Sequence, residues 1–588
     1  MGKIHRSRYN VDILKVDLLT FVFRHNDIET RSRPQYFDAF RPDRHFSLAQ
    51  GEEYAKRIGL GLRKLGLESD DKVLLFSGNN LIFPPLLWGV IAADCVFTAV
   101  SPTASSSELE NQLKASNSKV VITSLDLVDK AVQAAAKAGI PTDRVFIFCH
   151  PEDADHISRP TAVKPWTAFW ASQSEGMKFQ WNVSTDPKYL ASKTVILNFS
   201  SGYVLSESNR YNVTKTENLL LYRTTGPPKG VEITHANVVA NSTQLVHYRT
   251  MAADRPSSHA RRERLARSGE RWLAPLPMYH AYGQIYYCVN APLMAAKVYI
   301  MSRYEIGLLL LFVDLYRITF LTGVPTVLVQ MSKQPAGRFN LESIEYALTG
   351  SAPLGGETAR FIEKNFLPRG LVLRQGWGMT ETTNSMSGFS PDDPEDFRSI
   401  GYLNPNCLGQ VVPVEGMSWA DEVPAGVEVG ELWVSGGNVI KGYYNNPQAT
   451  EQTVVMRDGI RWLRTGDVAY FDADGKIFIV DRLKELIKVE GLQVSPAELE
   501  AVIISHEGVA DAAVLAAKID GGEYPRAFVV KKDPTITEST VHDLIKERFA
   551  KHKWLTGGVY FINEIPKTPS GKAQKRRLPD RPAKVIKL

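Results

Sequence analysis

The apolar residues of the chain gather in short runs that are typical of buried β-strands. These runs start at residues 72, 119, 144, 194, 318 and 371 and read KVLLF, KVVIT, RVFIF, TVILNF, ITFLTGV and LVLRQGWG. The stretches between them have helical spacing. This alternation of strands and helices predicts an α/β fold.

Two helix starts carry recognisable patterns. Ser107 with Glu110 forms a capping-box pattern, and Ser495 is followed by proline at the first helical position. Segment 59–66 is predicted as a helix closed by Gly66, because no strand precedes it as a dinucleotide loop requires. The most apolar stretches, 81–100 and 306–324, contain prolines or charged residues, so we expect buried core and no membrane span.

The pattern changes from Gly430 onward to strand, turn and strand, with GELWVSG, FDADG and KIFIVDR in succession. A compact α+β segment follows Asp481. The sequence therefore predicts a large multi-subdomain N-terminal domain over residues 1–480 and a small C-terminal domain over residues 481–588.

Composition narrows the class of protein. Hydrophobic residues are 44% and charged residues 23% of the 588-residue chain, which is typical of folded globular proteins. The formal net charge is only +5, and most of it lies after Asp481, where we interpret the basic tail mainly as a solvated surface. We expect no nucleic-acid partner.

The four cysteines, Cys95, Cys149, Cys288 and Cys407, are far apart and lack zinc-ligand spacing. They predict neither a disulfide framework nor a structural metal, and they favour a reducing, intracellular compartment. The N-terminus lacks the apolar segment of a secretory signal.

A loop of small and hydroxyl-bearing residues at 224–230, TTGPPKG, is suited to binding a polyphosphate. Glycines let backbone N–H groups point at an anion, threonines add donors, and Lys229 supplies a positive charge. The loop lacks the GxxxxGK[ST] spacing of P-loop proteins. A plain surface turn is the alternative interpretation.

A second cluster, QGWGMTE at 375–381, follows an apolar strand. Trp377 could stack on a purine, Thr380 could donate to an α-phosphate, and Glu381 could hold Mg²⁺ between phosphate oxygens. The alternative is a tryptophan packed in a turn. Further along the chain, Asp467 in WLRTGD could accept hydrogen bonds from ribose hydroxyls. Lys572 follows Ser570 and Gly571, which predict a turn near the C-terminus.

These motifs stand in an order that resembles the adenylate-forming superfamily of acyl-CoA synthetases, luciferases and 4-coumarate:CoA ligases, and above all the fungal 4-coumarate:CoA ligase-like proteins. The likeness covers essentially the whole chain and rests on FSSG, TTGPPKGV, PLPMYHAYG, TGSAPLG, QGWGMTE, GELWVSG, WLRTGD, DRLKELIKVEG and PKTPSGK. It implies a ligase that activates a carboxylic acid with ATP and Mg²⁺ to an acyl-adenylate and then transfers the acyl group to coenzyme A.

The resemblance also implies roles for residues of the nucleotide site. The phosphates would lie against Ser200, Ser201, Gly202, Thr224, Thr225, Gly226 and Lys229, and the adenine against Ser351, Ala352, Pro353, Gln375, Gly376 and Trp377. Asp467 would bind ribose and Arg482 would stay near the ribose and phosphate. Thr380 and Glu381 keep the roles given above, and Lys572 would be the cation of the adenylation step.

The acyl pocket and the coenzyme A path are implied in the same way. His280, near the substrate carboxylate, and Tyr282 would line the acyl pocket together with Gly323 and Gly350, which suggests an aryl or medium-chain acid. The C-terminal domain would rotate after adenylation about a hinge at 481–484. Lys484, Lys488, Gly491 and Gln493 would meet the acyl-adenylate or the pantetheine, and Arg303 the phosphates of coenzyme A.

The chain departs from the family pattern inside the phosphate loop, where residues 203–223 separate Gly202 from Thr224. We interpret this segment as an insertion or a retained intron. Its 21 codons are in frame, its start can be written with a GTACGT donor, and its end with a TACAG acceptor. If the segment is present in the protein, we expect strongly reduced adenylation, because Gly202 and Thr224 must approach like consecutive residues, about 3.8 Å apart.

Two smaller departures concern coenzyme A and location. Glu490 stands where the family usually has a lysine, and a carboxylate there would repel the phosphates of coenzyme A. The C-terminal residues 586–588, Ile-Lys-Leu, resemble a peroxisomal address with isoleucine in place of a small residue. The expected location is cytoplasmic or peroxisomal.

Two other functions stay open. The enzyme could deliver its acyl group to a carrier-protein thiol, which Glu490 favours, or the chain could be an inactive homologue, which the interrupted phosphate loop favours. The acid itself, the pathway and the oligomeric state are not readable from the sequence.

Overall fold

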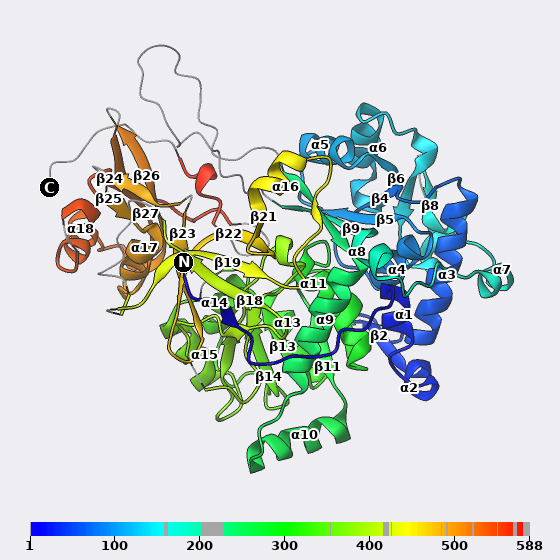
Figure 1. The fold of residues 1–588 in the computed structure, drawn as a ribbon, viewed down its shortest axis with the longest axis horizontal. Helices are drawn as coiled ribbons and strands as arrows, with labels where there is room; N and C mark the ends of the chain where they lie inside the picture. The colour runs from blue at the N-terminus through cyan, green and yellow to red at the C-terminus, as the bar shows by residue number, and fades with distance from the viewer. Residues whose placement is uncertain are drawn as a thin grey trace.

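The computed structural model describes residues 2–157, 163–200, 228–352, 354–394, 396–414, 423–424, 426–483, 485–489, 492–519, 522–549, 551–567 and 573–579. Its strands and helices alternate along most of the chain, so the predicted α/β class is confirmed (Figure 1). The predicted runs at 72, 119, 144, 194, 318 and 371 all contain strands.

An eight-stranded sheet forms one half of the N-terminal region. Its central strands are parallel, while β10 and β20 are antiparallel to their neighbours. In spatial order the strands are β20 (Gly442–Tyr443), β10 (Lys229–Thr234), β9 (Thr194–Ser200), β5 (Val96–Val100), β4 (Lys72–Phe76), β6 (Ser118–Ser124), β7 (Val145–Phe148) and β8 (Lys164–Pro165).

A seven-stranded sheet forms the other half and is parallel except at β3. Because parallel strands end at one edge, the loops after β13, β14 and β15 come together there. The spatial order is β15 (Leu373–Gln375), β14 (Tyr346–Thr349), β13 (Phe320–Gly323), β11 (Arg271–Ala274), β12 (Lys297–Ile300), β2 (Pro34–Asp38) and β3 (His45–Ser47).

Helices pack on these sheets, and one large apolar core joins elements of both. Every residue of α4 (Phe83–Ala92) is buried, and the Trp88 indole donates to the Cys288 carbonyl at 3.0 Å. The segment 81–100, predicted as buried core, is therefore confirmed as such. The other α-helices described before residue 454 are α1 (Leu18–Phe23), α2 (Ile28–Ser32), α3 (Leu48–Lys64), α5 (Ser106–Ser116), α6 (Val128–Lys137), α7 (Gln173–Lys178), α8 (Pro187–Ser192), α9 (His235–Thr250), α10 (Pro256–Ser268), α11 (Ala281–Ile285), α12 (Ala291–Leu293), α13 (Ile306–Leu315), α14 (Pro325–Ser332), α15 (Gly356–Asn365) and α16 (Pro447–Thr453).

A six-stranded sheet and a C-terminal lobe complete the chain, and Figure 1 shows that lobe at the left. The sheet contains β1 (His5–Arg6), β18 (Leu408–Val412), β19 (Val429–Ser435), β22 (Ile460–Phe471), β21 (Val454–Arg457) and β23 (Ile477–Arg482); β16 (Ser387–Gly388) pairs with β17 (Tyr402–Leu403). The lobe has its own apolar core, formed by β24 (Ile487–Val489), β25 (Leu492–Val494), α17 (Pro496–Ile504), β26 (Val509–Ile519), β27 (Gly522–Lys531), α18 (Glu538–Lys546) and β28 (Val559–Phe561).

One predicted helix cap is wrong by two residues. The capping box of α5 joins Ser105 to Glu108, not Ser107 to Glu110. Starting the helix at residue 106 places Leu109 and Leu113 on its buried face, and packing selects this register among three consecutive serines. The predicted cap of α17 is confirmed, since the Ser495 side chain accepts from the Glu498 amide.

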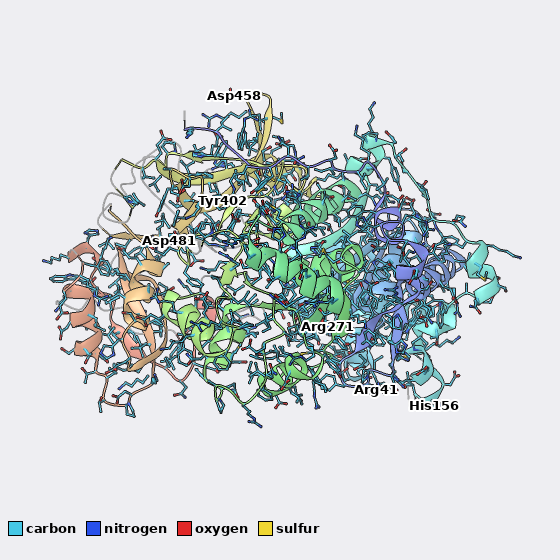
Figure 2. The ribbon with its side chains drawn as sticks, turned by 90° about the horizontal axis from the view of Figure 1, so that it is seen from below. Arg41, His156, Arg271, Tyr402, Asp458 and Asp481 are labelled. Carbon is cyan, nitrogen blue, oxygen red and sulfur yellow. The ribbon has the colours of Figure 1, made fainter. Side chains whose placement is uncertain are left out.

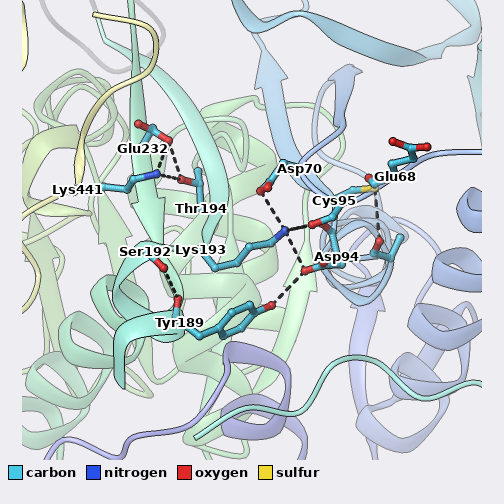
Figure 3. Close-up of polar contacts among 12 residues, drawn as sticks. Glu68, Asp70, Asp94, Cys95, Tyr189, Ser192, Lys193, Thr194, Glu232 and Lys441 are labelled. Atoms are coloured by element: carbon cyan, nitrogen blue, oxygen red, sulfur yellow. Dashed lines mark hydrogen bonds and ion pairs between the residues drawn. The ribbon is translucent and has the colours of Figure 1, made fainter. Parts of the chain in front are cut away.

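Lys193 ties three segments of the eight-stranded half together (Figure 3). Its ammonium group donates to the Ser69 hydroxyl at 2.9 Å and to the Asp94 carbonyl at 2.8 Å, and it pairs with the carboxylates of Asp70 and Asp94 at 3.0 and 2.9 Å. Asp70 and Asp94 both have positive φ, so the lysine fixes two left-handed turns.

We expect Lys193→Met to destabilise the protein by about 2–3 kcal/mol. The lysine side chain is only 7% exposed, and its loss would deprive the Asp70 and Asp94 carboxylates of their nearest cation. The matched control is Lys441→Met. Lys441 pairs with Glu232 at 3.0 Å but is 40% exposed, so its loss should cost less than about 1 kcal/mol. Urea denaturation of both variants checks this, and equal losses would contradict it.

Candidate active site

The loops after β14 and β15 touch each other at the carboxyl edge of the seven-stranded sheet. The Gly376 amide donates to the Thr349 carbonyl at 2.9 Å. A β-carbon at Gly350 would lie 3.3 Å from the Gly376 carbonyl oxygen and 3.6 Å from the Tyr282 ring. Glycine at 350 therefore lets three of the predicted site segments meet.

Backbone strain is found on both sides of this edge. Ser351 has a φ of 74° and Thr383 a φ of 67°, a conformation that non-glycine residues rarely adopt. Such strain is typical of functional loops that the surrounding fold holds in place. Gln375 is one of the holding groups here, because its side chain accepts from the Leu354 amide and donates to the Phe397 carbonyl.

The Asp467 carboxylate holds two of the other predicted residues. Its Oδ2 accepts from the Trp377 indole at 2.9 Å, and its Oδ1 pairs with the Arg482 guanidinium at 2.9 Å. Asp467 and Arg482 are direct partners in the antiparallel β22–β23 ladder, and Asp467 is 3% exposed. Each carboxylate oxygen has a second lone pair, so the group can still accept from ribose hydroxyls.

Glu381, Tyr443 and Lys229 form a second polar group. The Tyr443 hydroxyl donates to Glu381 Oε1 at 2.9 Å, and Lys229 Nζ lies 4.9 Å from the centre of the Tyr443 ring. All three side chains are buried. Burial lowers the pKa of Lys229, while the negative charge of Glu381 acts in the opposite direction.

This second group fits Mg²⁺ bound with a nucleotide. Mg²⁺ commonly takes one or two protein carboxylates and fills its other positions with phosphate oxygens and water. Glu381 would be that carboxylate, with Thr380 preceding it in the short 3₁₀-helix Thr380–Thr382. Within the described ranges, no cluster of three or more His, Cys, Asp and Glu side chains offers an all-protein metal site.

His280 and Tyr282 lie around the start of α11. His280 is the N-cap residue, is half-buried, and has its ring 4.9 Å from that of Tyr279. The Tyr282 hydroxyl is buried and has no hydrogen-bond partner among the described residues. Burial raises the pKa of Tyr282 far above its ordinary value, so this phenol stays neutral.

The other predicted residues divide into three sets. Ala352 is half-buried next to Ser351, Gly323 is buried at the end of β13, and Arg303 is exposed with its guanidinium 5.2 Å from the Phe40 ring centre. The side chains of Ser200, Lys488 and Gln493 are not described. Outside the described residues lie Ser201, Gly202, Thr224, Thr225, Gly226, Pro353, Lys484, Glu490, Gly491, Lys572 and the segment 203–223.

Sequence reasoning missed Tyr443. Its strand, β20, has two residues, too short for any periodic pattern, and it reaches Glu381 only because it pairs with β10. Reasoning from sequence also missed a cavity of about 50 Å³ whose lining includes Gly376. A larger surface cavity, of about 650 Å³, is lined by none of the predicted residues.

Comparison with known proteins agrees with this arrangement. The model of the AMP-binding enzyme family matches residues 23–203 and 223–444, and that of the AMP-binding enzyme C-terminal domain matches residues 498–572. The chain belongs to the AMP-binding enzyme family. The resemblance stated from the motifs is thus confirmed.

Named relatives cover nearly the full chain. A phenylacetyl-CoA ligase of Aspergillus niger is 31% identical, over 97% of this chain and 98% of the relative. A 4-coumarate-CoA ligase of Narcissus pseudonarcissus is 32% identical, over 93% and 90%. The fold is shared with ATP-bound MatB from Rhodopseudomonas palustris, at a TM-score of 0.74 and 23% identity over 95% of this chain and 98% of that one.

The described part of the chain has no helix that combines the length and the apolar character needed to cross a bilayer. The apolar helix α13 agrees with this, since it has only 10 residues and contains Asp314.

Asp481 lies where the C-terminal lobe meets the six-stranded sheet (Figure 2). It is 5% exposed, its Oδ1 accepts from the Arg482 amide, and its Oδ2 has no hydrogen-bond partner among the described residues. Burial raises the pKa of Asp481 to about 7, and the negative charge of Glu485 adds to the shift. A charged Asp481 therefore opposes this arrangement of the chain.

We expect Asp481→Asn to stabilise the protein at pH 8 and to have little effect near pH 4. The folded-state pKa is above the unfolded one, so the penalty grows as the pH rises from about 4 to 7 and is constant above that, reaching at most about 4 kcal/mol. Denaturation midpoints at the two pH values measure it. The control is Asp458→Asn, because Asp458 is exposed and asparagine also adopts its left-handed φ. An effect of Asp481→Asn on stability that does not change with pH would contradict the prediction.

Proposed function

We propose that the protein is an AMP-forming ligase that joins a carboxylic acid to coenzyme A. The observation that carries the proposal is a pair of polar clusters within a chain of the AMP-binding enzyme family. In one, the buried Asp467 contacts Trp377 and Arg482. In the other, the buried Glu381 lies with Tyr443 and Lys229. The named relatives, a phenylacetyl-CoA ligase and a 4-coumarate-CoA ligase, support the same chemistry.

The first step joins two anions, so charge neutralisation is its main requirement. A carboxylate oxygen attacks the α-phosphorus of ATP, the bond to the bridging oxygen breaks, and pyrophosphate leaves with the electron pair. Glu381 would hold Mg²⁺, which would neutralise part of the phosphate charge, and Lys229 and Lys572 would offset the remaining charge. Asp467 would fix the ribose and so orient the α-phosphate.

In the second step the thiol of coenzyme A attacks the acyl carbonyl carbon, and AMP leaves. We assign this step to a rotated C-terminal domain with its hinge at 481–484. The separate family match over 498–572 and the separate core of the lobe support that division. A carrier-protein thiol is the alternative acceptor, and omission of coenzyme A from the assay distinguishes the two. We further propose that the enzyme works in the cytoplasm or the peroxisome. The argument for the peroxisome is that residues 586–588, Ile-Lys-Leu, resemble a peroxisomal address.

We treat residues 203–223 as an insertion or retained intron, since the family match stops at residue 203 and resumes at 223. Removing them would restore a continuous loop from Gly202 to Thr224. We expect carboxylate-dependent ATP–pyrophosphate exchange, tested on a panel of aryl and fatty acids, to be much faster in the shortened chain than in the full one.

The control for this assay is Glu381→Gln in the shortened chain, which should lower the exchange rate by about 10²–10³, because it removes the charge opposite Mg²⁺. Equal exchange in the full and shortened chains would show that the loop tolerates the insertion. Nucleotide binding without exchange in either form, for every acid of the panel, would instead identify an inactive homologue.

A further inference from the structure

The segment 573–579 directly follows Lys572 in the chain and is held to the C-terminal lobe by backbone contacts. Its first residue pairs with Lys567 in an isolated antiparallel bridge. The amide of Gln574 donates to the Pro566 carbonyl at 2.6 Å. The backbone on the two sides of the predicted turn is therefore paired.

Lys575 lies in this segment, three residues after Lys572, and pairs with two glutamates. Its Nζ is 2.8 Å from Glu500 Oε1 and 3.2 Å from Glu485 Oε2. The lysine side chain is 22% exposed, so solvent screens these ion pairs only in part. Burial alone would lower the pKa of Lys575, but the charges of the two glutamates raise it, and the lysine stays protonated.

Glu500 anchors Lys575 to the core of the lobe. It lies in α17, whose Leu499 and Ile503 are buried in that core. Its Oε1 also accepts from the Val514 amide of β26 at 2.7 Å. Because Glu500 is fixed by its helix and by a strand, it gives the lysine a partner of defined position.

Glu485 connects the same lysine to the exit of the proposed hinge at 481–484. The Glu485 amide donates to the Arg482 carbonyl at 2.9 Å, and Arg482 pairs with Asp467 at 2.9 Å. Both glutamates and the lysine lie after the hinge in the chain. A rotation about the hinge would therefore carry the three side chains together and leave their ion pairs intact.

Arg577 shows that the segment 573–579 also lies near the N-terminal region. The pKa of Glu108, at the start of α5, is lowered chiefly by its hydrogen bonds with Ser105 and in smaller part by the positive charge of Arg577. The segment that follows Lys572 is therefore fixed to the lobe and close to the region that carries the proposed nucleotide site.

We propose that Lys575 is a positioning residue for the adenylation step. By joining Glu485 to Glu500, it fixes the segment after Lys572 to the lobe, so that the lobe and Lys572 move as one unit. This inference rests on the proposed function, since it concerns the lysine assigned to the first step. The transfer to coenzyme A, in which we assign no role to Lys572, does not depend on Lys575.

The first test measures the two steps separately in the full and shortened chains, with the acid that gives the fastest exchange. ATP–pyrophosphate exchange reports adenylation, and coenzyme A-dependent release of AMP from the added acyl-adenylate reports the transfer. We expect Lys575→Met to lower the maximum exchange rate about tenfold or more, because a displaced catalytic group costs rate. The Michaelis constant for ATP and the rate of AMP release should stay unchanged, and Lys575→Arg, which keeps a cation between the glutamates, should restore the exchange.

The matched control is Lys553→Met. Lys553 pairs with Glu498, another glutamate of α17, at 2.9 Å, and its side chain is 6% exposed. Its loss should destabilise the lobe at least as much as the loss of Lys575, yet it should leave the exchange rate unchanged below the unfolding temperature. Equal losses of exchange in Lys553→Met and Lys575→Met would overturn the inference.

Hydrogen–deuterium exchange of the full chain gives a readout that needs no catalysis. The amides of Gln574 and Arg577 donate to the carbonyls of Pro566 and Gln574. We expect both amides to exchange about tenfold faster in Lys575→Met, because local opening becomes easier, and to be unaffected in Lys553→Met. Unchanged protection of these amides in Lys575→Met would overturn the inference whatever the activity.

The variant Lys572→Ala separates this inference from the proposed function. Pyrophosphate exchange that is lost in Lys572→Ala but survives in Lys575→Met overturns the inference alone. Absence of exchange in both unsubstituted chains, for every acid of the panel, overturns the proposed ligase activity instead. In that case the protection of the Gln574 and Arg577 amides still decides whether Lys575 fixes the segment.

Discussion

The carboxylate of Asp467 is the interaction on which the arrangement of the site depends. It comes from the six-stranded sheet, binds the indole of Trp377 in the loop after the seven-stranded sheet, and pairs with Arg482 at the entrance to the C-terminal lobe. Because it is 3% exposed, its charge is little screened by solvent, and both partners are needed to keep it buried. One side chain thus links the two sheets that border the proposed nucleotide site to the segment about which the lobe would turn.

The parallel sheet explains why the remaining groups gather at the same edge. Strands β13, β14 and β15 end together, and their loops supply Gly323, Gly350 and Gly376. The approach is so close that a β-carbon at Gly350 would lie tightly against the Gly376 carbonyl and in contact with Tyr282. The strained φ angles of Ser351 and Thr383 are consistent with this crowding, since the flanking strands hold the loops in conformations that they would not adopt alone.

Local patterns predicted most of the fold because strands and caps are encoded in a few neighbouring residues. The KVLLF run became β4, and the Ser495–Pro496 start became the first turn of α17. The cap of α5 was misplaced because Ser105 and Ser107 are locally equivalent and only the packing of Leu109 and Leu113 distinguishes them. Tyr443 could not be found in the same way, because it acts through a strand pairing across more than 200 residues.

The strand register also explains how a family fold could accept the segment 203–223. Ser200 and Lys229 are partners in the β9–β10 ladder, so the two ends of the connection are held together by the sheet whatever lies between them. Removing 21 residues would shorten the connection 201–228 from 28 residues to 7. Since each halving of a loop changes its closure free energy by about 0.6 kcal/mol, the total change is only about 1.2 kcal/mol. The insertion therefore changes the free energy of folding very little. We still expect adenylation to be impaired, because the resemblance to the family implies that the phosphates meet donors on both sides of Gly202, and a low cost of loop closure does not restore that spacing.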